Sequence, residues 1–185
     1  LLLAREFIAK GHDVDLVLLR KQGVLLDQVP AEVRVVDLQA DRVRQGFMPL
    51  VRYLREHRPD ALLASMWPLT TLAALAAKVA RFRGRVVMSE HAALTKSPIG
   101  MGPSGLALRV CMLWVNPQAD DVVGVSRGVV GDLHALGLPR TIGRTIYNPV
   151  QISNKRDVPD DWRHHPWMLA LPASRLIAVG SLKPQ

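Results

Sequence analysis

The chain has 185 residues, of which 49% are hydrophobic, 22% charged and 5% aromatic, enough for one hydrophobic core and the start of a second. Its single cysteine, Cys111, excludes a disulfide framework and favours a reducing, cytosolic compartment. The formal charge of +8 favours anionic partners, but the scattered arginines form no stripe interleaved with aromatic residues, so we expect no nucleic-acid partner.

Short apolar runs alternate with helix-like segments along the first 150 residues. In chain order we predict a helix at 1–10, strands at 13–19 and 33–38, a helix at 47–57, a strand at 60–65, a helix at 67–82, a strand at 85–91, a helix at 106–115, a strand at 121–125, a helix at 127–135 and a strand at 144–147. This alternation, with its short connections, predicts an α/β fold with a doubly wound parallel sheet.

Residues 151–172 differ in character from the rest, because they are polar and interrupted by Pro159, Pro166 and Pro172. We interpret them as a linker. The linker would join a first domain at 1–150 to a second domain that opens at 173–185 with a further strand.

The strand at 85–91 runs without a turn signal into Ser89, Glu90 and His91. In parallel sheets ligands bind beyond the carboxyl ends of the strands, so these three residues lie where a site is expected. An imidazole there can donate a hydrogen bond or act as a base near neutral pH. The alternative is a loop histidine bonded to backbone. The following stretch, 92–105, is rich in Gly and Pro and predicts a mobile loop over the site.

Ser126 and Arg127 follow the next predicted strand and begin a helix. The free N–H groups of a helix N-terminus suit a phosphate, and Arg127 would add a charged fork. The alternative is a plain capping serine with an exposed arginine, and the sequence alone favours that alternative slightly.

Two further motifs lie at the predicted domain edge and beyond it. Asn148 precedes a proline, which ordinarily marks a turn and here makes a hinge candidate. Gly180 and Ser181 end the strand of the second domain, where backbone amides can approach an anion with Lys183 as the counter-charge.

Several familiar signatures are missing. No Gly-x-Gly-x-x-Gly follows a strand, which disfavours a nicotinamide-dependent Rossmann enzyme. No cysteine or paired carboxylate completes a ligand set beside His164 and His165, so we expect no metal. No uncharged apolar stretch reaches the ~18 residues of a spanning helix.

Six stretches, in this order, together resemble the retaining glycosyltransferases of family 4, which have the GT-B fold: 3–7 with 11–14, 58–60, 86–91, 119–126, 146–150 and 177–185. The resemblance implies two Rossmann-like domains facing each other across a cleft, of which 1–150 is the acceptor side. It also implies a nucleotide-sugar donor and a glycan or lipid-linked acceptor, in cell-envelope polysaccharide synthesis. No cofactor or metal is needed, because the donor's leaving phosphate would help to deprotonate the acceptor.

The resemblance implies roles for the candidate residues. His91, with Glu90, would be catalytic, with His91 near the reacting sugar carbon. The substrate-binding residues would be Ser89, Ser126, Arg127 and Asn148, with Gly180, Ser181 and Lys183 in the diphosphate-binding loop. A cytoplasmic enzyme is implied, and the basic charge would suit peripheral contact with an anionic membrane.

The family's first strand and glycine-rich loop would precede Leu1, and most of its donor domain would follow Gln185. We therefore expect a fragment with little activity alone, whose incomplete sheet exposes apolar surface. The alternative function is a non-catalytic Rossmann-like module that binds a glycan or a partner domain.

Overall fold

The computed structural model describes residues 1–96, 106, 110, 113–115, 119–149 and 166. Contacts divide the chain into two units, Leu1–Pro149 and Val150–Gln185. Of the second unit only Pro166 is described, so the predicted linker at 151–172 and the predicted second domain at 173–185 lie outside the described residues.

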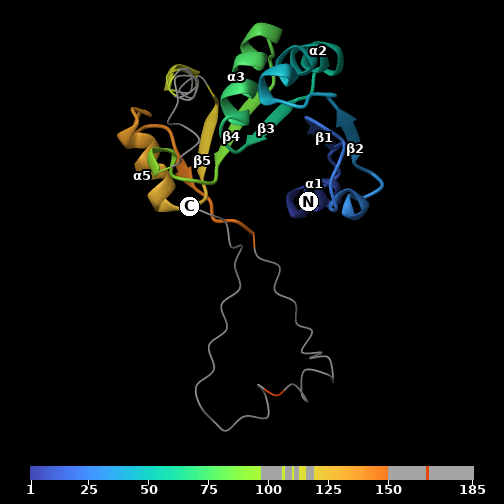
Figure 1. Ribbon diagram of the computed structural model, residues 1–185, viewed down its shortest axis with the longest axis horizontal. Helices are drawn as coiled ribbons and strands as arrows, with labels where there is room; N and C mark the ends of the chain where they lie inside the picture. The colour runs from blue at the N-terminus through green and yellow to red at the C-terminus, as the bar shows by residue number, and fades with distance from the viewer. Residues whose placement is uncertain (97–105, 107–109, 111–112, 116–118, 150–165, 167–185) are drawn as a thin grey trace. The chain divides into compact units, whose positions relative to one another are not determined.

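The first unit alternates helices and strands as predicted (Figure 1). Its elements in chain order are α1 (Leu2–Ala9), β1 (Asp15–Leu18), the 3₁₀ turn η1 (Leu26–Gln28), β2 (Arg34–Asp37), the 3₁₀ turn η2 (Val43–Gly46), α2 (Phe47–His57), β3 (Ala61–Ser65), α3 (Leu69–Ala80), β4 (Arg85–Glu90), the 3₁₀ turn η3 (Leu94–Lys96), β5 (Asp121–Gly124), α5 (Arg127–Ala135) and β6 (Arg144–Thr145). The described residues of the predicted helix at 106–115 are helical, and the others lie outside the described part.

One helix ends and another begins where local signals in the sequence predict. Arg58 closes α2 in the left-handed conformation, with φ at 46°, and the next residue is a proline that cannot continue the helix. Ser126 caps α5, because its Oγ accepts a hydrogen bond from the backbone N–H of Val129 at 3.2 Å. The last strand, β6, is shorter than the predicted 144–147. The backbone N–H of Ile146 donates to the carbonyl of Gly124, which is the last residue of β5, so β5 offers no further partner.

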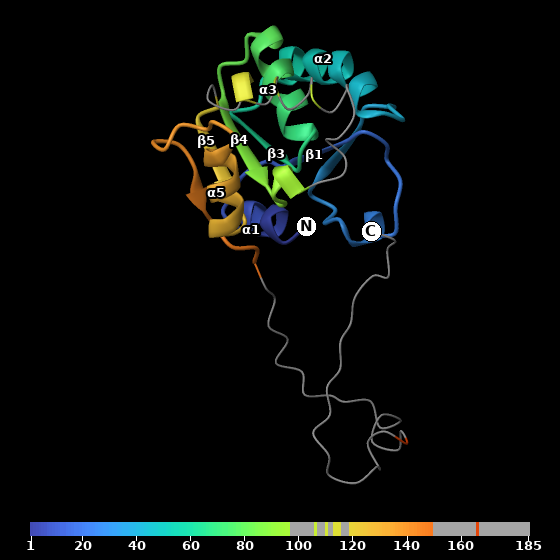
Figure 2. The same cartoon turned by 60° about the vertical axis from the view of Figure 1, so that its left-hand side comes forward.

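All strand pairs are parallel, as predicted, but the hydrogen bonds form two sheets where the sequence predicted one. The first sheet is β1–β2, and the second has the order β3–β4–β5–β6. Among the described strands, β1 pairs with β2 alone and β3 with β4 alone, so within this part of the chain each has one unpaired edge. In both views α2 and α3 lie side by side above the strands, while α1 and α5 lie lower (Figures 1 and 2).

Two hydrophobic clusters fill the first unit. One joins β4 and β5 to α5 through Met88, Val122 and Leu133, each at most 1% exposed. The other packs α2 on α3, with the half-buried Val17 and Val36 of the two-stranded sheet against it. Burial of these apolar side chains is the main force that holds helices and sheets together.

Apolar side chains remain exposed on β3 and on α1. Leu63, in the middle of β3, is 45% exposed, and Met66, the first residue after the strand, is 57% exposed. No residue of α1 is buried, and Leu3 and Phe7 on it are 50% and 40% exposed. This agrees with the expectation of exposed apolar surface.

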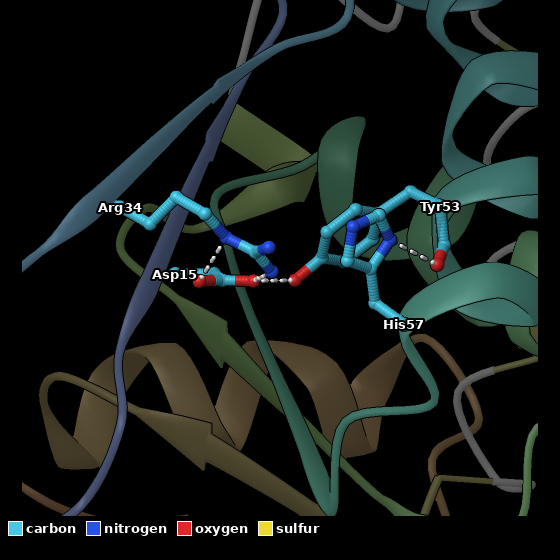
Figure 3. A network of polar contacts seen from close by, with 4 residues as sticks. All are labelled: Asp15, Arg34, Tyr53 and His57. Carbon is cyan, nitrogen blue, oxygen red and sulfur yellow. Dashed lines mark hydrogen bonds and ion pairs between the residues drawn. The ribbon is translucent and has the colours of Figure 1, made fainter.

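A polar network ties the two-stranded sheet to α2 (Figure 3). Asp15 on β1 accepts hydrogen bonds from Arg34 on β2 and from the hydroxyl of Tyr53 on α2, the latter at 2.5 Å. The bond from Arg34, with help from Tyr53, lowers the pKa of Asp15. Burial and the neighbouring carboxylate raise the pKa of Tyr53 to about 12, so its hydroxyl stays a donor at neutral pH. His57 stacks on the Tyr53 ring, with ring centroids 4.7 Å apart.

Tyr53→Phe tests this link. Tyr53 is 5% exposed, so the substitution removes one buried hydrogen bond without changing the apolar packing, and we expect the free energy of unfolding to fall by about 1 kcal/mol. Urea denaturation measures this. The matched control is Tyr147→Phe, at a residue 64% exposed, where we expect a change within about 0.5 kcal/mol. Equal effects of the two substitutions would contradict the assignment.

Candidate functional site

The carboxyl ends of three neighbouring strands bring the first group of predicted site residues together. Ser89 on β4 lies opposite Ser65 on β3, and Glu90 lies opposite Gly124 on β5. Backbone bonds continue past the strands, since Met66 N–H donates to the Ser89 carbonyl at 2.9 Å and Val125 N–H donates to the Glu90 carbonyl at 3.1 Å. Ser89 and Glu90 therefore lie at the carboxyl end of β4, as the sequence predicted, and the binding of a ligand there stays a prediction.

The side chain of Glu90 points into the protein. It is 1% exposed, and its carboxylate accepts hydrogen bonds from the Thr70 hydroxyl at 2.5 Å and from the Trp67 backbone N–H at 3.0 Å. Thr70 lies in the first turn of α3, and Trp67 directly precedes the N-cap residue Pro68, so both donors lie near the helix end where the dipole favours negative charge. Burial raises the pKa of Glu90, and the bonds from Thr70 and Trp67 act against that rise. Buried in this way, the carboxylate binds α3 to β4.

His91 differs from Glu90, because its side chain is exposed. Its Nε2 lies 3.2 Å from Oγ of the half-buried Ser89, and the tautomer of the imidazole decides which of the two donates. Nε2 of the ring is thus held by Ser89, and within the described part of the chain Nδ1 makes no hydrogen bond. Of Ser89, Glu90 and His91, it is the imidazole that can act on a bound molecule at this edge.

A residue that the sequence analysis missed holds the segment after His91. Asp132 on α5 accepts hydrogen bonds from the backbone N–H of Leu94 at 2.7 Å, from the backbone N–H of Thr95 at 3.3 Å and from the Thr95 hydroxyl. The carboxylate thereby caps η3, which begins at Leu94. Nothing in the local sequence signals this contact, because its partners are 37 and 38 positions apart. Thr70 was missed for the same reason.

Within the described part of the chain, no hydrogen bond or ion pair joins the remaining predicted site residues to His91. Ser126 lies beside the end of β4 but uses its Oγ to cap α5, as the capping alternative proposed. Arg127 is exposed and makes no ion pair within the described part of the chain. Asn148 is exposed three residues beyond β6. Gly180, Ser181 and Lys183 lie outside the described residues.

The described residues also bear on two other kinds of site, a metal site and a membrane span. Within them, no group of three or more His, Cys, Asp or Glu side chains could hold a metal ion. None of the helices among them is long and apolar enough to cross a membrane. The expectation that no metal is needed stays a prediction.

Parallel sheets with flanking helices define a Rossmann-like α/β protein, and in such proteins ligands bind at the carboxyl ends of the strands. The family model described as Glycosyltransferase Family 4 matches residues 1–154. The chain therefore belongs to glycosyltransferase family 4, as the resemblance indicated.

A solved structure agrees with this fold. HepE from Anabaena, in complex with UDP and glucose, aligns with a TM-score of 0.61 and 21% identity over 88% of this chain and 45% of its own. The apo form of the lipopolysaccharide outer core galactosyltransferase WaaB aligns with a TM-score of 0.49 and 18% identity over 70% of this chain and 36% of its own. The chain thus spans less than half the length of either protein. No curated protein matches it.

Glu90→Gln tests the burial of the carboxylate. Because the folded-state pKa of Glu90 is raised above its usual 4.5, the folded state binds this proton more tightly than the unfolded state does. The resulting stability is fully present below the unfolded-state pKa and is lost as pH rises through the folded-state pKa. We therefore expect the free energy of unfolding of the wild type, relative to Glu90→Gln, to fall with rising pH.

Urea denaturation at steps from about pH 4 to about pH 7 measures this difference. The control is Glu56→Gln at an exposed position of α2, which we expect to change the free energy of unfolding by less than about 0.5 kcal/mol. A difference between wild type and Glu90→Gln that stays constant with pH would contradict the account of Glu90.

Proposed function

We propose that this chain is the acceptor-side part of an enzyme that transfers a sugar from a nucleotide-sugar donor to a glycan or lipid-linked acceptor, with retention of configuration. The observation that carries the proposal is the exposed imidazole of His91 at the carboxyl edge of a parallel sheet, in a chain of glycosyltransferase family 4. Ligands bind at this edge in open α/β sheets.

In the proposed reaction the bond between the sugar's anomeric carbon and the leaving diphosphate breaks. The acceptor oxygen forms its new bond to that carbon on the same face, and the acceptor's proton passes to an oxygen of the leaving phosphate. His91 would donate a hydrogen bond to a sugar hydroxyl near the reacting carbon and so fix the sugar's orientation. The burial of Glu90 supports a reaction without a protein nucleophile from this edge.

The donor-side assignments follow from the same proposal. Ser126 and Arg127 would face the cleft between two domains, and Asn148 would lie at the hinge. Gly180, Ser181 and Lys183 would contact the donor's diphosphate, with no metal or other cofactor. A nucleotide-sugar donor is supported by the solved complex of HepE with UDP and glucose.

We also propose that the acceptor belongs to cell-envelope polysaccharide synthesis and that the enzyme acts at the inner face of the membrane. Support for these comes only from charge: the chain carries a formal charge of +8, which attracts anionic lipid headgroups. Release from anionic vesicles at raised salt would be the expected behaviour.

His91→Ala tests the proposed role of the imidazole in the complete product of the gene. With a panel of radiolabelled nucleotide sugars, we expect at least about a 100-fold loss of transfer, the usual cost of a group that orients or stabilises the reacting atoms. The melting temperature should not change, because the side chain is exposed. His12→Ala, at another exposed histidine, is the matched control and should keep full activity.

Two outcomes would count against the proposal. Equal activity of the His91→Ala and wild-type proteins would remove His91 from the reaction. If the wild type neither binds a nucleoside diphosphate by calorimetry nor transfers any sugar, sugar transfer is excluded. Binding of a glycan or a partner domain would then favour the non-catalytic module.

A further inference from the structure

The segment that carries His91 is fixed at both of its ends by buried or backbone-directed bonds. At the first end, Glu90 is held by its side chain on α3 and by its carbonyl on Val125. At the second end, Asp132 holds the backbone of Leu94 and the backbone and hydroxyl of Thr95.

Leu94 strengthens the second attachment. Its side chain is 4% exposed and packs in the same hydrophobic cluster as Met88, Val122 and Leu133. The carboxylate of Asp132 and this apolar contact therefore act on one residue, the former on its amide and the latter on its side chain. Between the two attachments lie only His91, Ala92 and Ala93, a span too short to move far when both ends are fixed.

We infer that Asp132 is a positioning residue for His91: through Leu94 and Thr95 it sets the path of the chain directly after the imidazole. The inference rests on the proposed function. It adds to that function a residue on a different helix, 41 positions from the group that would touch the sugar. Asp132 itself touches no substrate.

The physical reason is the sensitivity of transfer reactions to alignment. A displacement of about 1 Å in a positioned group can cost ~100-fold in rate. Without the carboxylate, the two amides and the Thr95 hydroxyl lose their acceptor, and the three residues between Glu90 and Leu94 gain freedom at one end. Substrate could still bind, but His91 would meet the sugar in the correct orientation less often.

The test compares Asp132→Ala with Asp120→Ala in the complete gene product. Asp120 is a matched control, because its carboxylate accepts the backbone N–H of Val86 at 2.7 Å, the same kind and length of bond, at the opposite end of β4. We expect Asp132→Ala to lower kcat by about 10- to 100-fold with a smaller change in KM, and Asp120→Ala to leave both within about 3-fold.

A double-mutant cycle separates positioning from general destabilisation. In a His91→Ala background, which removes the imidazole, we expect Asp132→Ala to cost less than about 3-fold, because the group on which it acts is already lost. Asp132→Asn, which keeps one acceptor oxygen, should recover part of the kcat. Costs that multiply independently in the double mutant, or equal kcat for Asp132→Ala and Asp120→Ala, would overturn the inference.

Hydrogen exchange tests the contact without any activity. In Asp132→Ala the amides of Leu94 and Thr95 should exchange at least about 10-fold faster, while that of Val86 should not change; Asp120→Ala should give the reverse. Unchanged exchange at Leu94 would overturn the inference at its structural basis. If the wild type transfers no sugar, the proposed function fails instead, and this exchange result still decides whether Asp132 holds the segment.

Discussion

The arrangement of the site depends on one buried interaction, the carboxylate of Glu90 held by Thr70 and by the backbone of Trp67. A buried carboxylate without partners costs on the order of several kcal/mol, so the N-terminal end of α3 must stay against the end of β4. That constraint fixes the last residue of the strand. His91, the next residue, is thereby presented to solvent at a defined place, with Ser89 in contact with its ring.

The fold explains why the adjacent residues Glu90 and His91 differ in burial. Successive side chains of a strand point to opposite faces, so Met88 and Glu90 share one face of β4 and are buried, while Val87 and Ser89 share the other face and are half-buried. Glu90 has a structural role in holding α3, whereas His91, the residue just beyond the last strand pairing, has an exposed side chain. Under the proposed function this imidazole would orient a donor sugar, and α5 would contribute by holding the chain that follows.

Local signals in the sequence predicted the elements well and the contacts between them poorly. The limits of α2 and α5 were predicted to the residue, because an amphipathic run closed by Arg58 and a serine cap at 126 act within one turn of the chain. The pairing of Glu90 with Thr70, and of Asp132 with Leu94, joins residues 20 and 38 positions apart and leaves no local pattern. The sequence also did not predict that β1 and β3 belong to two separate sheets, because strand order depends on packing and not on any one segment.

The central claim is that His91 meets the donor sugar at the end of β4. Histidine-selective NMR of the complete gene product, titrated with a nucleotide sugar and separately with the nucleoside diphosphate, measures this most directly. We predict that the His91 resonances shift more with the nucleotide sugar than with the diphosphate, while those of the exposed His12 stay in place. Saturable binding of the nucleotide sugar with no shift at His91 would contradict the account.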